Sequence, residues 1–222
     1  PGAVMNLNAL KDELKSRNDI EKIKEVIKNK VRPILVMDGG NIEFIDYKDK
    51  QNFEFCYPEG IVDYIKEIQN EKSFSEPHYV ECERRGKDRE DKDEYKVKLS
   101  CVFCFNNEIN LLEYYHNSSF LEHGGSPDKA VRNAFTYVID KFIKNANKYN
   151  KNESKITFQD VEDSLILISN SFSTQTSYEN QTKKAITNKF IQEAMTDFLK
   201  HSLEIYFIEN PLELWSDLCY II

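Results

Sequence analysis

The sequence predicts an α+β fold, in which one layer of mixed or antiparallel strands is covered by two long helices. Residues 127–147 and 188–209 place apolar side chains at helical spacing over many turns. Residues 95–105 and 164–172 have the composition and alternation of strands instead. The length of 222 residues, with 40% hydrophobic and 31% charged residues, suits one large domain or one domain with a helical extension.

The amino-terminal part of the chain predicts a helix followed by a hairpin. Residues 7–30 are polar, with apolar positions at roughly helical spacing, which predicts one long helix or two helices that break near Asn18. Residues 34–37 and 42–47 look extended on either side of an Asp-Gly-Gly-Asn turn. Residues 53–57 then complete a hairpin.

The next segments predict a short helix, a loop and a second hairpin. Proline is tolerated at the first helical position, so Pro58 predicts a helix through residue 70. The charges of residues 81–96 nearly cancel, which predicts a solvated, mobile loop between strands. Residues 95–105 form a half-buried strand, and an Asn-Asn turn joins it to residues 109–115 in an antiparallel hairpin.

The carboxyl-terminal half supplies the two long helices and a central strand. Pro127 begins the first helix, which continues to about Asn147. Residues 164–172 are apolar on both faces, which predicts a strand at the centre of the sheet. The second helix ends at Asn210, because the residue before a proline avoids the helical region.

Charge and composition exclude several classes of protein. The 30 Lys and Arg against 38 Asp and Glu give a net charge of −8, the wrong sign for a protein that neutralises DNA phosphates by itself. Any DNA contact is therefore expected to be local or shared with other segments. No run of about 18 apolar residues and no signal peptide pattern occurs, which predicts a cytoplasmic protein without membrane contact.

The cysteines and histidines predict no metal site. Five cysteines at irregular spacing are typical of a reducing compartment. Cys101 and Cys104 have C-x-x-C spacing, but residues three apart on a strand point to opposite faces and cannot chelate one ion. The four histidines show no ligand or triad spacing, so each is expected to be an ordinary polar surface or capping residue.

One loop carries a candidate ligand site. Residues 169–184 are rich in Ser and Thr and end in two adjacent lysines, Lys183 and Lys184, just ahead of a helix. A lysine there supplies a mobile cation, and Gln181 and Thr182 add neutral donors, a combination that suits a terminal phosphate. A solvated loop with a basic edge is the alternative.

Residues 30–46 weakly resemble a family of metal-cluster proteins. Residues 30–46 resemble the iron–sulfur scaffold domain of NifU-like proteins, but that family needs a C-x-x-C shortly downstream, where only Cys56 stands. The cluster chemistry therefore has no ligands. A kinase of related topology is a further alternative, although no glycine-rich phosphate loop is complete.

A stronger resemblance covers residues 30–218. Residues 181–183 (Q-T-K) and the helix after them resemble the transducer domain of type IIA DNA topoisomerase B subunits, the gyrase B and ParE subunits, with a likeness to clostridial members. Three further motifs follow the family's order along the chain. They are the F-x-Y-x-G-G-I hairpin (residues 53–61), the G-G-T-H helix start (residues 123–135) and the D-x-R-E-G-L strand entry (residues 158–165).

The resemblance implies a fold, a ligand and roles for three residues. The fold is the topology that these transducers share with GHMP kinases. Lys183, with Gln181 beside it, would contact the γ-phosphate of ATP held with Mg²⁺ in a separate GHKL ATPase domain, and Lys183 would also act in catalysis. Arg132 corresponds to a basic position that faces transported DNA, with an ordinary exposed helix arginine as the alternative. The implied partners are the GHKL and Toprim domains of the same subunit, the gyrase A or ParC subunit, and DNA.

Some residues depart from the family pattern. Glu59 replaces a glycine, Pro127 replaces the histidine of G-G-T-H, and residues 162–164 replace R-E-G. The ATPase and Toprim motifs are missing, so this chain alone is expected to be inactive, and a stand-alone binding module derived from a topoisomerase is an alternative function.

The expected divisions are a cloning remnant and start (residues 1–5), an unassigned helical segment (6–30), the transducer (31–210) and a truncated end (211–222).

Overall fold

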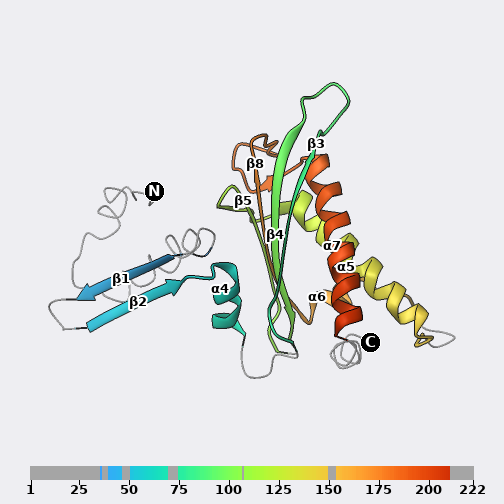
Figure 1. Cartoon of the computed structure of the whole chain (residues 1–222), viewed down its shortest axis with the longest axis horizontal. Coiled ribbons are helices and arrows are strands. Elements are labelled where there is room, and N and C mark those ends of the chain that lie inside the picture. Colours follow the sequence, from blue (N-terminus) through green and yellow to red (C-terminus); the bar gives the residue numbers. More distant parts are fainter. Residues whose placement is uncertain are drawn as a thin grey trace.

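A five-stranded sheet with helices on both faces forms the body of the molecule. The computed structural model describes residue 36 and residues 40–46, 51–69, 75–106, 108–149 and 154–210. Figure 1 shows two long helices, α5 and α7, on one face of the sheet and the short helix α4 on the other. The α+β fold with a mixed sheet and two long covering helices is confirmed.

The strands lie in the order β3-β4-β8-β5-β6. Within this sheet β5 and β8 run parallel to each other, and the other described neighbours are antiparallel. The sheet is therefore mixed, and β8 lies at its centre, as its two apolar faces predict. The bounds are β3 His78–Gly86, β4 Tyr95–Phe105, β5 Leu111–His116, β6 Ser119–Phe120 and β8 Leu165–Ser173.

The predicted hairpin between residues 95–105 and 109–115 is wrong. Strand β8 inserts between β4 and β5, so that Leu167 pairs with Phe103 on one side and with Leu112 on the other. The strand whose residues 165–168 are apolar and buried on both faces thus takes the central position. The side chain of Asn106 turns the chain after β4, because it accepts hydrogen bonds from the next backbone amides.

The predicted loop over residues 81–96 is longer than the connection that the structure shows. Its first part belongs to the edge strand β3, and only residues 87–94 connect β3 to β4. The opposite charges that suggested a loop are paired across the two strands, with Glu83 to Lys96 at 2.6 Å and Glu81 to Lys98 at 3.4 Å. Such a solvent-facing ladder of charges is compatible with an edge strand.

The main core lies between the sheet and the two long helices. Helix α5 (Ser126–Asn145) and helix α7 (Lys189–Glu209) confirm the predicted helices and pack against each other. A short helix, α6 (Phe158–Glu162), begins with a capping box between Thr157 and Asp160. One face of β4 points into this core, which confirms the predicted alternation, with Val97, Leu99, Cys101, Phe103 and Phe105 all buried.

Helix α4 (Ile61–Ile68) covers part of the opposite face of the sheet. The prediction of a half-buried strand holds only for the first half of β4, because Val102 and Cys104 are buried in a second apolar cluster with α4. The helix begins three residues later than Pro58 predicts. Gly60 adopts a φ of 60°, and its amide donates to the carbonyl of Tyr57 at 3.0 Å, so residues 58–60 form a turn instead.

Strands β1 (Gly40–Asp46) and β2 (Gln51–Tyr57) form a separate two-stranded sheet. Their antiparallel register, in which Gly40 faces Tyr57, confirms the predicted hairpin. Of the expected extended residues 34–37 only Val36 is described, and it is helical and buried. The predicted helix over residues 7–30 and the expected end segment 211–222 lie outside the described residues, and the domain divisions stay predictions.

Candidate functional site

The loop over residues 174–188 joins the central strand β8 to the longest helix, α7. Its tip, residues 180–183, is built around Asn180, whose side chain accepts a hydrogen bond from the amide of Thr182 at 3.1 Å and whose carbonyl accepts one from the amide of Lys183 at 3.3 Å. Lys183 has a φ of 58°, and both Gln181 and Lys183 are exposed. The structure therefore brings the two predicted ligand residues together at one tip.

The base of the loop, residues 174–179 and 184–188, is held by hydrogen bonds between its two sides. The amide of Glu179 donates to the carbonyl of Ala185 at 3.0 Å, and the amide of Thr187 donates to the carbonyl of Ser177 at 2.8 Å. A β-bridge between Tyr178 and Ile186 lies between these bonds. The two sides of the base are thus fixed to each other directly below the tip.

A glycine pair fastens the base to the start of α5. Strand β7 (Gly124–Gly125) pairs in parallel with strand β9 (Ala185–Ile186), and the amide of His123 donates to the carbonyl of Lys184 at 2.9 Å. Gly125 has a φ of 81°, and a Cβ atom there would lie 2.2 Å from the carbonyl oxygen of Ile186. Only glycine permits this approach. The sequence predicted the pair as a turn and did not indicate this contact.

The two adjacent lysines of the loop have different surroundings. The ammonium of Lys184 forms an ion pair with Glu122, and the hydrogen bond from Lys184 lowers the pKa of the Glu122 carboxyl. The ammonium of Lys183 lies 5.5 Å from the centroid of the Tyr178 ring and forms no ion pair with any residue that the structure describes. Lys183 is therefore the lysine whose charge is available to a partner.

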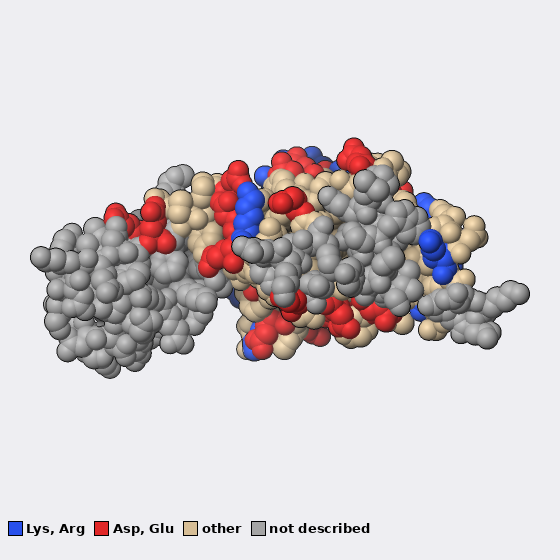
Figure 2. All heavy atoms as spheres, turned by 90° about the horizontal axis from the view of Figure 1, so that it is seen from below, with Lys and Arg blue, Asp and Glu red and all other residues tan. Residues whose placement is uncertain are grey.

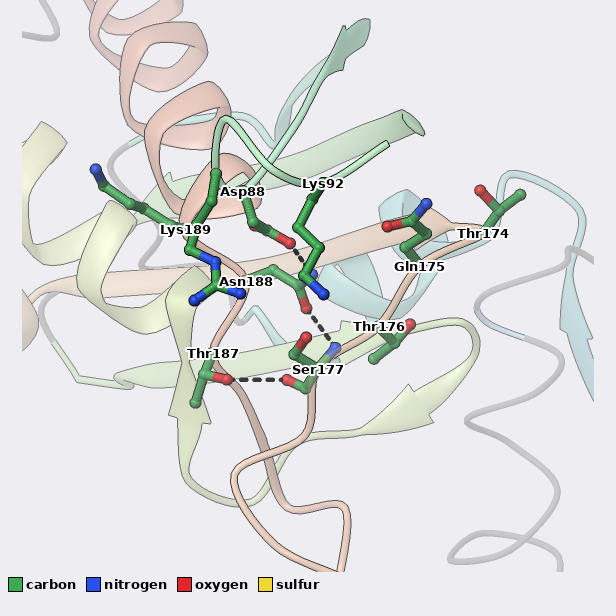
Figure 3. A pocket seen from close by; sticks show the side chains of 10 residues that line it. Asp88, Lys92, Thr174, Gln175, Thr176, Ser177, Thr187, Asn188 and Lys189 are labelled. Carbon is green, nitrogen blue, oxygen red and sulfur yellow. Dashed lines mark hydrogen bonds between the residues drawn. The ribbon is translucent and has the colours of Figure 1, made fainter. Parts of the chain in front are cut away.

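Asp88, from the connection between β3 and β4, connects the loop to α7. Its carboxylate accepts hydrogen bonds from the amide of Phe190 at 2.8 Å, from the side chain of Asn188 at 2.9 Å and from the hydroxyl of Tyr95 at 3.1 Å. Burial raises the pKa of Tyr95. Asn188 in turn accepts from the amide of Ser177 at 2.7 Å, as Figure 3 shows. Asp88 thus caps α7 and fixes the exit of the loop.

His116 holds the entry of the loop. Its Nδ1 lies 2.7 Å from the hydroxyl of Ser171, and its Nε2 lies 2.7 Å from the hydroxyl of Thr176. Ser171 donates to the carbonyl of Tyr115, so the network assigns the proton to Nδ1 and leaves Nε2 to accept from Thr176. Burial lowers the pKa of His116 to about 4.

The sequence missed the roles of His116 and Asp88. The expectation that every histidine is a surface or capping residue is wrong for His116, which is completely buried. Its position at the end of an apolar strand was a signal of burial, but no signal paired it with Thr176. Asp88 lies 100 residues from Asn188 along the chain, so no local sequence pattern indicated that the two would form a hydrogen bond.

Arg132 lies apart from the loop, in a network of its own. Its Nε donates to Asp128 at 2.9 Å, its Nη1 approaches Glu162 at 3.4 Å, and its guanidinium carbon lies 4.5 Å from the centroid of the Phe158 ring. Asp128 also accepts from the hydroxyl of Tyr114 at 3.0 Å. None of these contacts joins Arg132 to the loop over residues 174–188.

The described part of the chain contains no cluster of His, Cys, Asp and Glu that could hold a metal ion. Cys101 and Cys104 belong to the two different apolar clusters, which confirms that they point to opposite faces of β4. Among the helices of the described ranges, none is long and apolar enough to cross a membrane.

Comparison with known proteins decides the family. A family model described as DNA gyrase B matches residues 60–218. The chain belongs to the DNA gyrase B family. It is 26% identical to the DNA gyrase B protein of Mycoplasma pneumoniae over 195 residues, which cover 85% of this chain and 30% of that protein. It is 27% identical to the DNA gyrase B protein of Metamycoplasma arthritidis over 158 residues, which cover 71% of this chain and 25% of that protein.

Solved structures share the fold of this gyrase B family member. The ATP-binding domain of Francisella tularensis topoisomerase IV, solved with a small-molecule inhibitor, matches with a TM-score of 0.66 at 20% identity over 89% of this chain and 52% of that one. The 43K ATPase domain of Thermus thermophilus gyrase B, solved with an aminocoumarin, matches with a TM-score of 0.68 at 16% identity. The match covers 89% of this chain and 51% of that one. The chain spans about 30% of the curated M. pneumoniae relative, so the activity of a whole gyrase B protein belongs to the proposal below.

Proposed function

We propose that this chain is the transducer segment of a type IIA topoisomerase of the gyrase B or ParE kind, and that Lys183 senses the γ-phosphate of ATP bound with Mg²⁺ in an ATPase domain of the same polypeptide. The observation that carries the proposal is the contrast between a free tip lysine and a fixed loop base. Two solved relatives are described as an ATP-binding domain and an ATPase domain, which supports ATP as the nucleotide.

The tip has the chemistry that a terminal phosphate needs. A lysine offers a compact charge with three donors on a flexible stem, and the amide of Gln181 adds neutral donors two residues away. Both side chains are exposed, so they are accessible to a nucleotide in a neighbouring domain. Lys183 would stabilise charge that develops on the phosphoryl group during hydrolysis.

Hydrogen bonds connect the base of the loop to helix α7. Asn188 connects Ser177 on one side of the loop to Asp88, and Asp88 caps the first turn of α7. Helix α7 packs along α5 for much of its length, with Lys141 and Glu204 paired at 2.7 Å between them. Loss of the γ-phosphate would remove the partner of Lys183 and allow the domains to rotate relative to one another.

In this proposal the movement couples ATP hydrolysis to the opening and closing of a DNA gate during supercoiling or decatenation. The Toprim domain, the gyrase A or ParC subunit and DNA are the partners. This chain alone is predicted to hydrolyse no ATP and to cleave no DNA, because the ATPase and Toprim motifs lie outside its sequence.

DNA contact by Arg132 stays a prediction. Its guanidinium is held by two carboxylates, Asp128 and Glu162, so a DNA phosphate would have to compete with both. Figure 2 shows acidic and basic side chains interspersed on one face, without a continuous basic stripe among the residues it colours. DNA stimulation of ATP turnover in the complete subunit tests the contact, and stimulation that Arg132→Ala leaves unchanged would assign Arg132 a purely structural role.

The test of the proposal is ATP turnover by the complete subunit with Lys183→Ala. We expect kcat to fall about 100-fold, the usual effect of losing one donor to a developing charge, while nucleotide binding is largely retained. Lys184→Ala is the matched control, because that neighbouring lysine is already paired with Glu122. Normal turnover in Lys183→Ala, or an equal loss in both variants, would contradict the proposal.

A further inference from the structure

A pocket of about 720 Å³ opens beside the base of the loop. Three segments line it: the connection between β3 and β4, the entry of the loop (residues 174–177), and the exit of the loop with the first residue of α7 (residues 187–189). None of residues 178–186 lines it, so it is separate from the tip that carries Lys183. Its volume lies within the range of about 300–1,000 Å³ that small-molecule sites occupy.

The pocket is basic although the chain is acidic. Arg89, Lys92 and Lys189 line it, against the single carboxylate of Asp88. That carboxylate is directed at its own three internal donors. Lys189 lies 3.4 Å from Glu193. Arg89 lies 3.3 Å from Asp91.

Lys92 differs from the other two cations. Its ammonium has no carboxylate partner among the described residues. In Figure 3 its side chain points between Asn188 and Ser177, toward the middle of the pocket, whereas the side chain of Lys189 points away. Lys92 is therefore the cation that a bound anion would meet.

Neutral donors stand around the same space. The side chains of Thr174, Gln175 and Ser177 line the pocket, and none of them donates or accepts a hydrogen bond within the described structure. An ammonium combined with hydroxyl and amide donors from a second segment offers several oxygens of one anion a partner at once. A phosphate has enough oxygens to use them.

We propose that this pocket binds a phosphate-bearing ligand, with Lys92 supplying the charge and Ser177 and Gln175 supplying neutral hydrogen bonds. The ligand would connect the β3–β4 connection to the entry of the loop, two segments that Asn188 already links because it donates to Asp88 and accepts from the amide of Ser177. A polyphosphate chain and the phosphates of a nucleic acid backbone share this chemistry. The site does not depend on the proposed function of Lys183.

The experiment is calorimetric titration of this chain with sodium tripolyphosphate, and separately with a short DNA duplex, at low and moderate salt. We expect saturable binding of tripolyphosphate that Lys92→Glu weakens at least tenfold, because the exchange replaces an attraction by a repulsion at close range. Lys155→Glu makes the same change of charge at an exposed position outside the pocket and should alter affinity less than twofold. Thermal melting of each variant establishes that it folds.

The two ligands identify the source of the phosphate. Competition between the duplex and tripolyphosphate, with both weakened by Lys92→Glu, would support a nucleic acid backbone. Binding of tripolyphosphate alone would support a nucleotide polyphosphate. Absence of saturable binding, equal effects of Lys92→Glu and Lys155→Glu, or loss of binding in Lys183→Ala but not in Lys92→Glu would overturn the proposed site.

Discussion

The tip and the base of the loop over residues 174–188 use their polar atoms in opposite ways. At the base, backbone bonds, Asn188 and the glycine pair fix the chain on three sides. At the tip, Gln181 and Lys183 extend to solvent with no ion pair among the described residues. The domain therefore places its internal hydrogen bonds below the tip and leaves the side chains of Gln181 and Lys183 exposed.

The largest effect is expected at the base, from Gly125→Ala. The new methyl group would lie 2.2 Å from the carbonyl of Ile186, and the backbone has a φ of 81° that alanine disfavours. We expect unfolding free energy to fall by about 3 kcal/mol in a urea titration. The tip control Gln181→Ala should change it by less than about 0.5 kcal/mol. Equal stabilities would show that the base is not fixed as described.

A second large effect concerns pH and His116. The folded state lowers its pKa from 6.5 to about 4, so the unfolded state binds the proton more readily. Stability from this residue is complete above pH 6.5 and is lost as the pH falls from 6.5 toward 4, by up to about 3 kcal/mol. Unfolding of the protein and of His116→Gln should be compared at pH 7.5, 5.5 and 4.5. Parallel pH dependence in the two would contradict the assignment.

A smaller effect is expected for Asp88→Ala. The change removes the acceptor of the Phe190 amide, the Asn188 side chain and the Tyr95 hydroxyl, of which the last two still bond to each other at 3.1 Å. We expect a loss of about 2 kcal/mol and faster hydrogen exchange in residues 177–190. Asp91→Ala removes an exposed carboxylate from the same connection and serves as the control. Unchanged hydrogen exchange in Asp88→Ala would show that Asp88 does not stabilise the loop.

The sequence predicted the elements that local patterns determine. Helices α5 and α7, the hairpin of β1 and β2, and the alternation of β4 follow from periodicity and turn residues. It also predicted β8 at the centre, from its two apolar faces. The pairing of β4 with β5 failed because adjacency in sequence does not reveal which strand later inserts between two others. The prediction of a loop over the residues of β3 failed because a strand with cross-strand ion pairs and a solvated loop can have the same balanced charge composition.

The candidate site was only partly predictable for a similar reason. Gln181 and Lys183 are two residues apart in the sequence, so their position in one loop could be predicted from the sequence alone. Asp88, Gly125 and His116 act through partners 60 or more residues away, as Gly125 does through Ile186 and His116 through Thr176. Such contacts depend on the strand order, which was the part of the fold that sequence patterns did not determine.

The most direct test of the central claim is hydrogen exchange at residues 180–183 in the complete subunit. It should be measured without nucleotide, with ADP, and with a non-hydrolysable ATP analogue, each in the presence of magnesium. Our account predicts that the tip becomes protected with the ATP analogue and not with ADP, because only the analogue offers Lys183 a γ-phosphate. Equal protection by both nucleotides, or no protection by either, would contradict the claim that Lys183 senses the γ-phosphate.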